Sequence, residues 1–295
     1  MLGFTVIGLS LPQIGPALRP SILPVLGCLV LSVSLTVDFR EIKAAIKEPV
    51  LIPLALFLMF VPMPLMGWGL GHAYNDRNLT LGQVLIGSVP VDITAPLLVY
   101  LAGGRTALAL TVTIIAIGLT PVITPTLLLW LGGVKGVVSI PYLMLELFLI
   151  VVLPAAVGVS LRTLFSRQLE RFQPLCTMMA SLLYIELILA VVSGSALQIR
   201  AFNTYALAVI GFQVGHNFSG YLLGFIARSV TNDIGRIAPV MFLVSMKEFG
   251  IVPAVVFSTG LPETAVVPSV FFAIVQMISA PIAAKIIKRY FAERK

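Results

Sequence analysis

The chain has 295 residues, of which 59% are hydrophobic and only 11% are charged, and its formal net charge is +7. Its mean hydropathy is +1.06. Soluble globular domains carry about 25% charged residues, so this composition excludes a water-soluble enzyme, a nucleic-acid-binding protein and a disordered chain. One membrane-crossing helix takes about 20 residues. The sequence therefore predicts an all-α membrane protein with about ten transmembrane helices and short connections between them.

Hydropathy falls at clusters of charged residues, proline and glycine, and these breaks divide the chain into ten apolar segments. The first segment is too short to span a bilayer, and it lacks the basic start and the cleavage pattern of a signal peptide. The predicted segments are 1–12, 21–36, 49–71, 80–103, 105–132, 137–163, 173–197, 202–228, 235–258 and 264–290.

Lysine and arginine are unevenly divided between alternate connections. With a cytoplasmic N-terminus, fourteen of the 19 basic residues fall inside, and the four outside are Arg19, Arg77, Lys135 and Arg200. Cytoplasmic connections of membrane proteins retain lysine and arginine, so we expect both termini in the cytoplasm. The compact connections suit a bacterial inner membrane. The basic charge thus indicates topology and requires no anionic macromolecule as a partner.

The fourth segment is expected to be a broken helix. It reads GSVPVDITAPLLVYLAGG, with Pro90 and Pro96 on either side of Asp92. Each proline removes a backbone hydrogen bond and disfavours helix in the residue before it. A continuous helix through residues 80–103 is therefore not predicted.

The ninth segment has a second interruption, because Lys247, Glu248, Gly250 and Pro253 cluster near its middle. Paired broken helices in the two halves of a chain indicate a transporter binding site near the membrane midplane. The two breaks lie five segments apart, and five is an odd number, so the halves would have opposite orientations. We predict two inverted five-helix repeats, residues 1–132 and residues 133–295, in one membrane domain.

Ionisable residues inside membrane segments are energetically costly and point to function. Asp92 and Lys247 lie in the two interrupted segments, where freed backbone groups and water lower that cost. They are the main functional candidates. The alternative is a buried pair that only locks two helices together. Glu146 and Glu186 lie in regular segments, and we interpret them as structural.

Five stretches carry a family resemblance: LVLSVSLTVDF, VYLAGGRTALALTVT, TPVITP, GHNFSGYLLGF and SMKEFGI. They resemble the bile acid:sodium symporter family, whose superfamily also contains arsenite exporters. The resemblance implies ten helices in two inverted repeats, a panel domain and a core domain, and broken helices four and nine that cross at the substrate site. It also implies secondary transport of an organic anion by alternating access.

The sequence departs from the family at its sodium ligands. A Ser-Asn pair in the fourth helix of sodium-coupled members maps to Ala95 and Pro96 here. The Ser and Thr ligands of the fifth helix map to Ala109 and Thr113, and a glutamine of the third helix maps near Met59. Of these five positions, only Thr113 keeps a side-chain oxygen that could bind sodium.

In the ninth helix, the family pattern E-x-G-M-Q-N-S-G corresponds to residues 243–250, with Leu243 at the glutamate and Lys247 at the glutamine. We therefore expect the sodium sites to be absent. The ammonium of Lys247 would substitute for sodium, with Asp92 as its counter-ion. Burial favours the neutral form of a lysine, so proton exchange at Lys247 would couple transport to protons. A lysine that stays charged would instead leave an uncoupled carrier.

Three other functions are alternatives to sodium-independent transport of an organic anion. A sodium-coupled organic anion or bile acid symporter is the first. A metalloid efflux carrier is the second, and it is disfavoured because the pattern of the arsenite exporters has a cysteine in the fourth helix, whereas Cys28 and Cys176 both lie outside the fourth segment. A non-transporting membrane sensor is the third. An enzyme is not expected, since GHNFSG lacks a GxSG motif and the chain has no Asp-rich metal-binding motif.

The expected ligands are a small organic anion and, as a candidate coupling ion, the proton. A positive charge at Lys247 favours a carboxylate or sulfonate substrate. We expect a lipid bilayer as the environment and no metal, cofactor or nucleic acid. The candidate substrate and coupling residues are Lys247, Asp92, Glu248, Thr113, Pro96 and Gly250, and the candidate pathway residues are His216 and Asn217.

Overall fold

The computed structural model describes residues 2–37, 48–201 and 206–292, and its regular secondary structure within these ranges is entirely helical. The first half forms α1 (Leu2–Ser10), α2 (Gly15–Leu18), α3 (Ile22–Ser34), α5 (Leu51–Phe60), α6 (Pro62–His72), α7 (Arg77–Ser88), α8 (Ala95–Leu101) and α9 (Thr106–Leu131). The second half forms α10 (Ile140–Leu147), α11 (Leu153–Leu164), α12 (Ser166–Gly194), α13 (Ala196–Ala201), α14 (Ala206–Phe225), α15 (Ile234–Ser245), α16 (Ile251–Thr259) and α17 (Val267–Ala292). The short turns are η1 (Pro12–Ile14), η2 (Arg19–Ser21), η3 (Phe148–Val152), η4 (Ile226–Ser229) and η5 (Glu263–Val266).

Six helical stretches of the described chain are long and apolar enough to cross a membrane: Pro12–Ser34, Leu51–His72, Thr106–Leu131, Ile140–Leu164, Ser166–Gly194 and Glu263–Tyr290. The prediction of an all-helical, multi-pass membrane protein is confirmed. The count of ten helices and the inverted repeat stay predictions. The reason is that α7, α8, α15 and α16 have 12, 7, 12 and 9 residues, which is less than one full crossing.

Both predicted interruptions are present. Residues 89–94 separate α7 from α8, and Val89 is extended (φ −72°, ψ 157°) because Pro90 disfavours helix in the residue before it. Residues 246–250 separate α15 from α16 and begin in the extended conformation. Pro253 was expected near the second interruption, but it lies in the first turn of α16, where a missing N–H leaves no helical bond unmade.

Three predicted segments differ in detail from the structure. The third is divided at Val61, because Pro62 begins a new helix and restricts the residue before it. The sixth contains the π-helical turn η3, because Pro154 has no N–H for the carbonyl of Ile150. The second segment is already helical from Pro12, earlier than hydropathy alone predicted.

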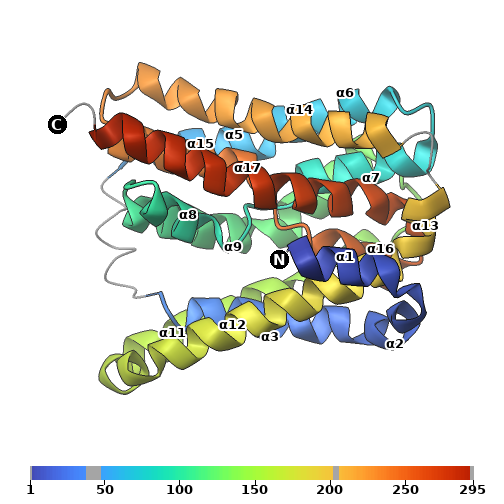
Figure 1. Ribbon diagram of the computed structural model, residues 1–295, viewed down its shortest axis with the longest axis horizontal. Coiled ribbons are helices and arrows are strands. Elements are labelled where there is room, and N and C mark those ends of the chain that lie inside the picture. The colour runs from blue at the N-terminus through green and yellow to red at the C-terminus, as the bar shows by residue number, and fades with distance from the viewer. Residues whose placement is uncertain (1, 38–47, 202–205, 293–295) are drawn as a thin grey trace.

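The helices form two layers (Figure 1). α1, α2, α3, α11 and α12 lie in one layer, at the bottom of that view, and α5, α6, α7, α8, α14, α15 and α17 lie in the other, at the top. We call these the lower and upper layers. α9 packs on α7, α8 and α15 of the upper layer and also on α10 and η3, which lead into α11. α16 contacts both α3 and α7 and so lies between the layers.

One charged cluster fixes the starts of α9 and α15. Arg236 binds both carboxylate oxygens of Glu48, with N···O distances of 2.9 Å and 2.5 Å. Arg105 joins Glu48 at 3.2 Å to Asp233 at 2.9 Å. Because Asp233 also accepts the N–H of Gly235 at 2.8 Å, the cluster includes the N-terminal cap of α15.

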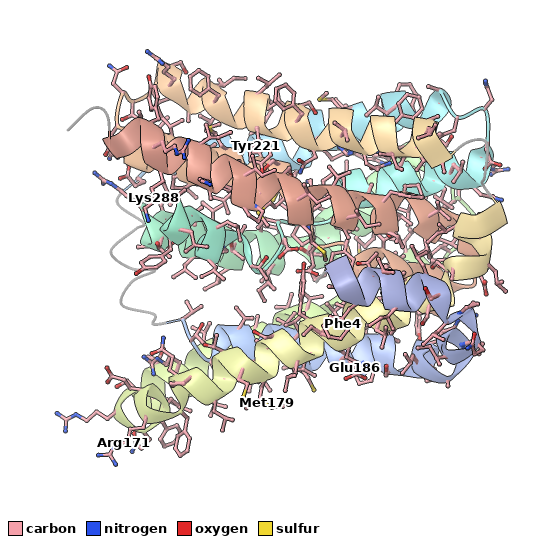
Figure 2. The ribbon with its side chains drawn as sticks, viewed as in Figure 1. Phe4, Arg171, Met179, Glu186, Tyr221 and Lys288 are labelled. Carbon is pink, nitrogen blue, oxygen red and sulfur yellow. The ribbon has the colours of Figure 1, made fainter. Side chains whose placement is uncertain are left out.

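Two of the basic residues predicted to be cytoplasmic lie at the same end of the molecule (Figure 2). Figure 2 shows Arg171, in the first turns of α12, and Lys288, near the end of α17, at the same end. Both belong to the set predicted to be cytoplasmic, so the structure brings these two members together. Five other members of that set lie outside the described residues: Arg40, Lys43, Lys47, Arg294 and Lys295.

Candidate functional site

The two helix interruptions lie against each other. The main-chain N–H of Glu248 donates to the carbonyl of Pro90 at 2.9 Å. In the opposite direction, the N–H of Ile93 donates to the carboxylate of Glu248 at 3.1 Å. These bonds satisfy backbone groups that the broken helices leave free. We call residues 89–94 and 246–250 together the junction, and it is the candidate site.

Lys247 is completely buried in the junction. Its Nζ donates to two main-chain carbonyls, those of Met59 at 3.1 Å and Val89 at 3.2 Å. Its main-chain N–H donates to Oε1 of Gln276, on α17, at 3.0 Å. Because carbonyl oxygens are common ligands of hard cations in proteins, the ammonium occupies the kind of position that a bound cation would take.

The expected ion pair between Lys247 and Asp92 is not formed among the described residues. Instead, four donors reach the buried Asp92 carboxylate: Thr94 N at 2.7 Å, Thr94 Oγ1 at 2.5 Å, Gln276 Nε2 at 2.7 Å and the Tyr184 hydroxyl at 3.2 Å. Gln276 therefore bridges the two residues, with its amide nitrogen on Asp92 and its amide oxygen on the backbone of Lys247.

Glu248 is the second buried acid of the junction, and it is 3% exposed. Its Oε2 accepts from Ile93, whereas its buried Oε1 has no hydrogen-bond partner in the part of the chain that the structure describes. A Cβ at Gly250 would lie 2.7 Å from a methyl of Leu187, so the glycine lets this half of the junction pack closely against α12 of the lower layer.

Two other candidates lie in α8 and α9, which contact each other. Pro96 is buried in the first turn of α8, directly after the first half of the junction. Thr113 is buried on α9, and within the described residues its hydroxyl has no hydrogen-bond partner. No hydrogen bond between described residues connects Thr113 to Lys247.

His216 belongs to a buried polar network. Gln83 Nε2 lies 3.0 Å from Nδ1 of His216, and Nε2 of His216 lies 3.1 Å from the carbonyl of Met63. The amide nitrogen of Gln83 can only donate, so Nδ1 of His216 accepts and its Nε2 is the protonated ring nitrogen. Gln213 and the hydroxyl of Tyr74 complete the network around Gln83. This network ties α14 to α6 and α7.

Asn217 connects three elements of the upper layer. Its Nδ2 donates to the carbonyl of Ser245, the last residue of α15, at 2.9 Å. Its Oδ1 accepts from the hydroxyl of Ser279, on α17, at 2.7 Å. Asn217 thus supports the end of α15 beside the junction, and its side chain is only 2% exposed.

Gln276 and Tyr184 were missed as candidates from the sequence. The candidates predicted from the sequence depended on ionisable and helix-breaking residues, whereas these two side chains are uncharged and lie in unbroken helices. Gln276 is a polar residue in an apolar segment, but many serines and threonines share that feature, so it does not single out Gln276.

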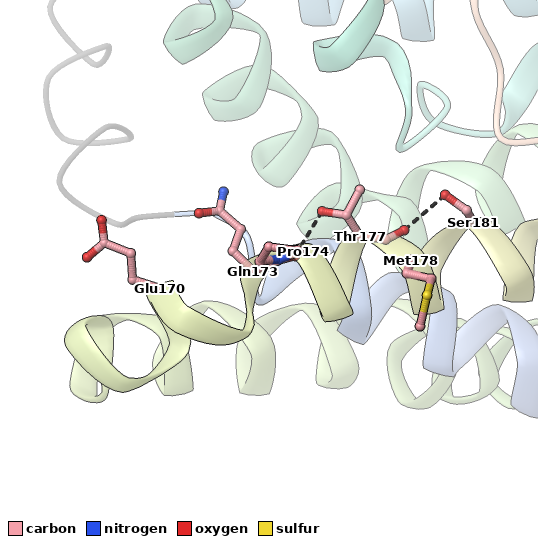
Figure 3. Close-up of a pocket in the computed structure, with 6 residues that line it drawn as sticks. All are labelled: Glu170, Gln173, Pro174, Thr177, Met178 and Ser181. Carbon is pink, nitrogen blue, oxygen red and sulfur yellow. Dashed lines mark hydrogen bonds between the residues drawn. The ribbon is translucent and has the colours of Figure 1, made fainter.

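A hollow of about 600 Å³ lies along the exposed first half of α12 (Figure 3). Its six lining residues are spaced three or four apart or adjacent, so they share one face of the helix: Glu170, Gln173, Pro174, Thr177, Met178 and Ser181. Tyr184 follows three residues later and is buried, with its hydroxyl on Asp92. This face of α12 therefore leads from an exposed surface to the junction.

The substitution Asp92→Asn is expected to lower transport about tenfold and to change its pH profile. All four contacts of Asp92 come from donors, so an amide group would face Gln276 Nε2 with another donor. Gln276 cannot turn its amide to compensate, because its oxygen accepts from Lys247. A mismatched buried hydrogen bond costs about 1–3 kcal/mol. Initial uptake rates in proteoliposomes across pH would measure the effect.

A second substitution tests the same bridge. Adding Gln276→Glu to Asp92→Asn is expected to recover part of the activity, because a carboxylate can accept from both the new amide and the N–H of Lys247. Glu186→Gln, on the half-buried surface of α12, is the matched loss of a membrane carboxylate. Equal rates and an unchanged pH profile in the single Asp92 variant would remove Asp92 from the mechanism.

Comparison with known proteins points to a transporter family. The family model described as Sodium Bile acid symporter family matches residues 23–202. A Bacillus subtilis (strain 168) protein described as an uncharacterized sodium-dependent transporter, YocS, is 26% identical over 255 residues, which cover 84% of this chain and 77% of YocS. The alignment thus extends well beyond the region of the family match.

Two further relatives match shorter regions. The uncharacterized protein YbaS of the same Bacillus strain is 31% identical over 155 residues, 49% of this chain and 51% of YbaS. A probable chloroplastic sodium/metabolite cotransporter, BASS2, of Oryza sativa subsp. japonica is 26% identical over 169 residues, 57% of this chain and 40% of that protein.

Proposed function

We propose that this chain, which belongs to the sodium bile acid symporter family, moves a small organic anion across a membrane by alternating access. The family and the relatives indicate a membrane transporter of the bile acid/sodium symporter type. The described helices supply the apolar lengths that a multi-pass membrane protein needs. The substrate class, the coupling ion and the mechanism are our proposals.

The observation that carries the proposal is the position of Lys247. Its ammonium is held by the carbonyls of Met59 and Val89, as a bound cation would be. The family resemblance places a sodium-binding glutamine at Lys247 and another near Met59. A hydrogen bond from Nζ of Lys247 to the carbonyl of Met59 joins these two positions here. We infer that Lys247 is a tethered cation and that transport does not require sodium.

We also propose an architecture from the family resemblance. We take the lower layer as the panel domain and the upper layer as the core domain, with the junction as the crossing of broken helices four and nine. Residues 1–132 and 133–295 would be the two inverted repeats. The substrate would bind between the layers at the junction, and both termini would lie in the cytoplasm of a bacterial cell.

Sodium coupling is the second candidate, because YocS is described as sodium-dependent. Backbone carbonyls of the junction, together with the unpartnered Oε1 of Glu248, would then have to supply the ligands. Proton coupling through Lys247 belongs to the first candidate, and it requires the ammonium to lose its proton during the cycle.

Uptake into proteoliposomes separates these candidates. A panel of labelled organic anions is offered under an imposed sodium gradient or an imposed proton gradient, at a fixed membrane potential. We expect accumulation with the proton gradient and none with the sodium gradient. Accumulation with sodium alone would overturn the tethered-cation proposal. Uptake of no anion under either gradient, with the protein folded, would overturn the transport of organic anions.

A further inference from the structure

Arg19 and Glu263 form an ion pair that joins the two layers. Arg19 lies in η2, just before α3 of the lower layer, and Glu263 lies in η5, just before α17 of the upper layer. Their side chains form an ion pair at 2.7 Å. The other carboxylate oxygen of Glu263 accepts from Gln198, on α13, at 2.6 Å.

The guanidinium of Arg19 is not fully used by this pair. Its carbon lies 4.4 Å from the ring centroid of Phe257, at the end of α16. Among the described residues, its buried Nε has no acceptor. The side chain as a whole is 36% exposed, so solutes can reach other parts of it. An arginine with an unused donor, a stacked ring and partial exposure matches the features of a carboxylate-binding group.

A hollow of about 250 Å³ adjoins the guanidinium. Most of its wall is apolar: Ile22 and Leu23 of the lower layer and Ala254 and Phe257 of α16. The hydroxyl of Ser258, also in the wall, donates its proton to Glu146 at 2.7 Å, so Arg19 is the charged donor among the lining residues. The hollow thus combines one cation with a surface suited to a small apolar body.

We propose that this hollow binds organic carboxylates with a small apolar body, and that the bound carboxylate replaces Glu263 on Arg19. The apolar body would lie against Leu23 and Phe257. This inference rests on the proposed function, because an organic anion is what the transporter would have to capture before it reaches the junction. It adds a second binding site, separate from the junction.

The exchange is energetically reasonable because one carboxylate takes the place of another. Glu263 is 40% exposed, and exposed ion pairs contribute only about 0–1 kcal/mol. The incoming anion would add burial of its apolar body, which the glutamate side chain does not supply. Two acids bind lining residues of the hollow, Glu263 through Arg19 and Glu146 through Ser258, and Glu263 is the one that would leave.

Such an exchange would also weaken a connection between the layers. The pair of Arg19 with Glu263 and the bond from Gln198 to Glu263 both hold η5 to elements outside the upper layer. Arrival of an anion would release Glu263 from Arg19. The site would therefore link substrate capture to separation of the layers at this end.

Equilibrium binding of radiolabelled benzoate to the full chain in nanodiscs tests the site without requiring transport. Benzoate carries one carboxylate on a small ring, and acetate serves as the competitor that lacks the apolar body. The variants are Arg19→Gln, Glu263→Gln and Leu23→Trp, the last of which fills the hollow and keeps the ion pair. Lys135→Gln removes an exposed basic residue elsewhere and is the matched control.

The two charge variants are expected to act in opposite directions. Arg19→Gln should weaken benzoate binding about tenfold, because the charge-assisted bonds are lost. Glu263→Gln should tighten it about threefold or more, because the competing carboxylate is gone. Leu23→Trp should abolish binding, Lys135→Gln should leave it unchanged, and acetate should compete weakly.

Three results would overturn this site: no saturable binding to the wild type, no effect of Arg19→Gln, or a shift in the same direction for both charge variants. The last would mean that the pair acts only as a latch between the layers. Gradient-driven uptake of an anion with no benzoate site would reject this inference and keep the proposed function. Benzoate binding without uptake of any anion would keep this binding site and reject the proposed function.

Discussion

Lys247→Gln is expected to reduce gradient-driven uptake to the level of liposomes without protein. The glutamine amide can still donate to one of the carbonyls of Met59 and Val89, so the change removes the charge and keeps a hydrogen bond. The charge is what the proposal needs, because it would balance the anionic substrate in a buried site of low dielectric. Initial rates of uptake for the transported anion measure the effect.

Folding must be separated from function in this variant. One carbonyl left without a donor would cost about 1–3 kcal/mol, so thermal unfolding in detergent should show a lower midpoint but a cooperative transition. Lys285→Gln, which removes an exposed lysine near the end of α17, should transport normally. Uptake at the wild-type rate by Lys247→Gln would reject the tethered cation, whatever its stability.

Gly82→Ala is expected to destabilise the fold by about 3 kcal/mol or more. A Cβ at Gly82 of α7 would lie 2.1 Å from the carbonyl oxygen of Ala265 in η5, and 2.8 Å from the carbonyl carbon. Both neighbours are backbone atoms, so no flexible side chain can turn away. Overpacking of a core usually costs about 1–3 kcal/mol, and displacement of η5 would also move the start of α17 and the pair of Glu263 with Arg19.

A second glycine provides the control for this experiment. Gly211 lies on the exposed face of α14, and a Cβ there would meet nothing within 4 Å. Gly211→Ala should therefore raise the midpoint slightly, because alanine favours helix over glycine by about 1 kcal/mol. An unchanged midpoint for Gly82→Ala would show that η5 can shift freely, and would contradict the close packing of α7 on it.

The sequence predicted features that depend on neighbouring residues. The interruptions at residues 89–94 and 246–250 follow from local proline, glycine and charge patterns, and the structure has both. Helix boundaries and irregular turns were harder, as at Val61, because hydropathy does not change there. The backbone geometry at a proline depends on a few neighbouring residues. A break such as the one at Val61 is therefore predictable from each proline and not from hydropathy.

Partner choice inside the site could not be predicted from sequence. Asp92 and Lys247 were expected to pair because they are the opposite charges of the two interruptions. In the structure, Gln276 lies between them, on a helix that starts after both interruptions in the chain. Which uncharged donor approaches a buried carboxylate depends on the packing of α17 and α12, and no pattern of residues within one segment records that packing.

The carbonyl-bound ammonium of Lys247 affects the energetics of a full transport cycle. A sodium ion that binds on one side and leaves on the other moves net charge and releases the energy of its gradient. A covalently attached ammonium returns with the empty carrier, so it moves no net charge over a complete cycle. As long as the ammonium keeps its proton, it can balance the charge of a bound anion, but it supplies no energy from an ion gradient to concentrate that anion. Accumulation against a gradient then requires the release of that proton, and without it the carrier would only equilibrate or exchange its substrates.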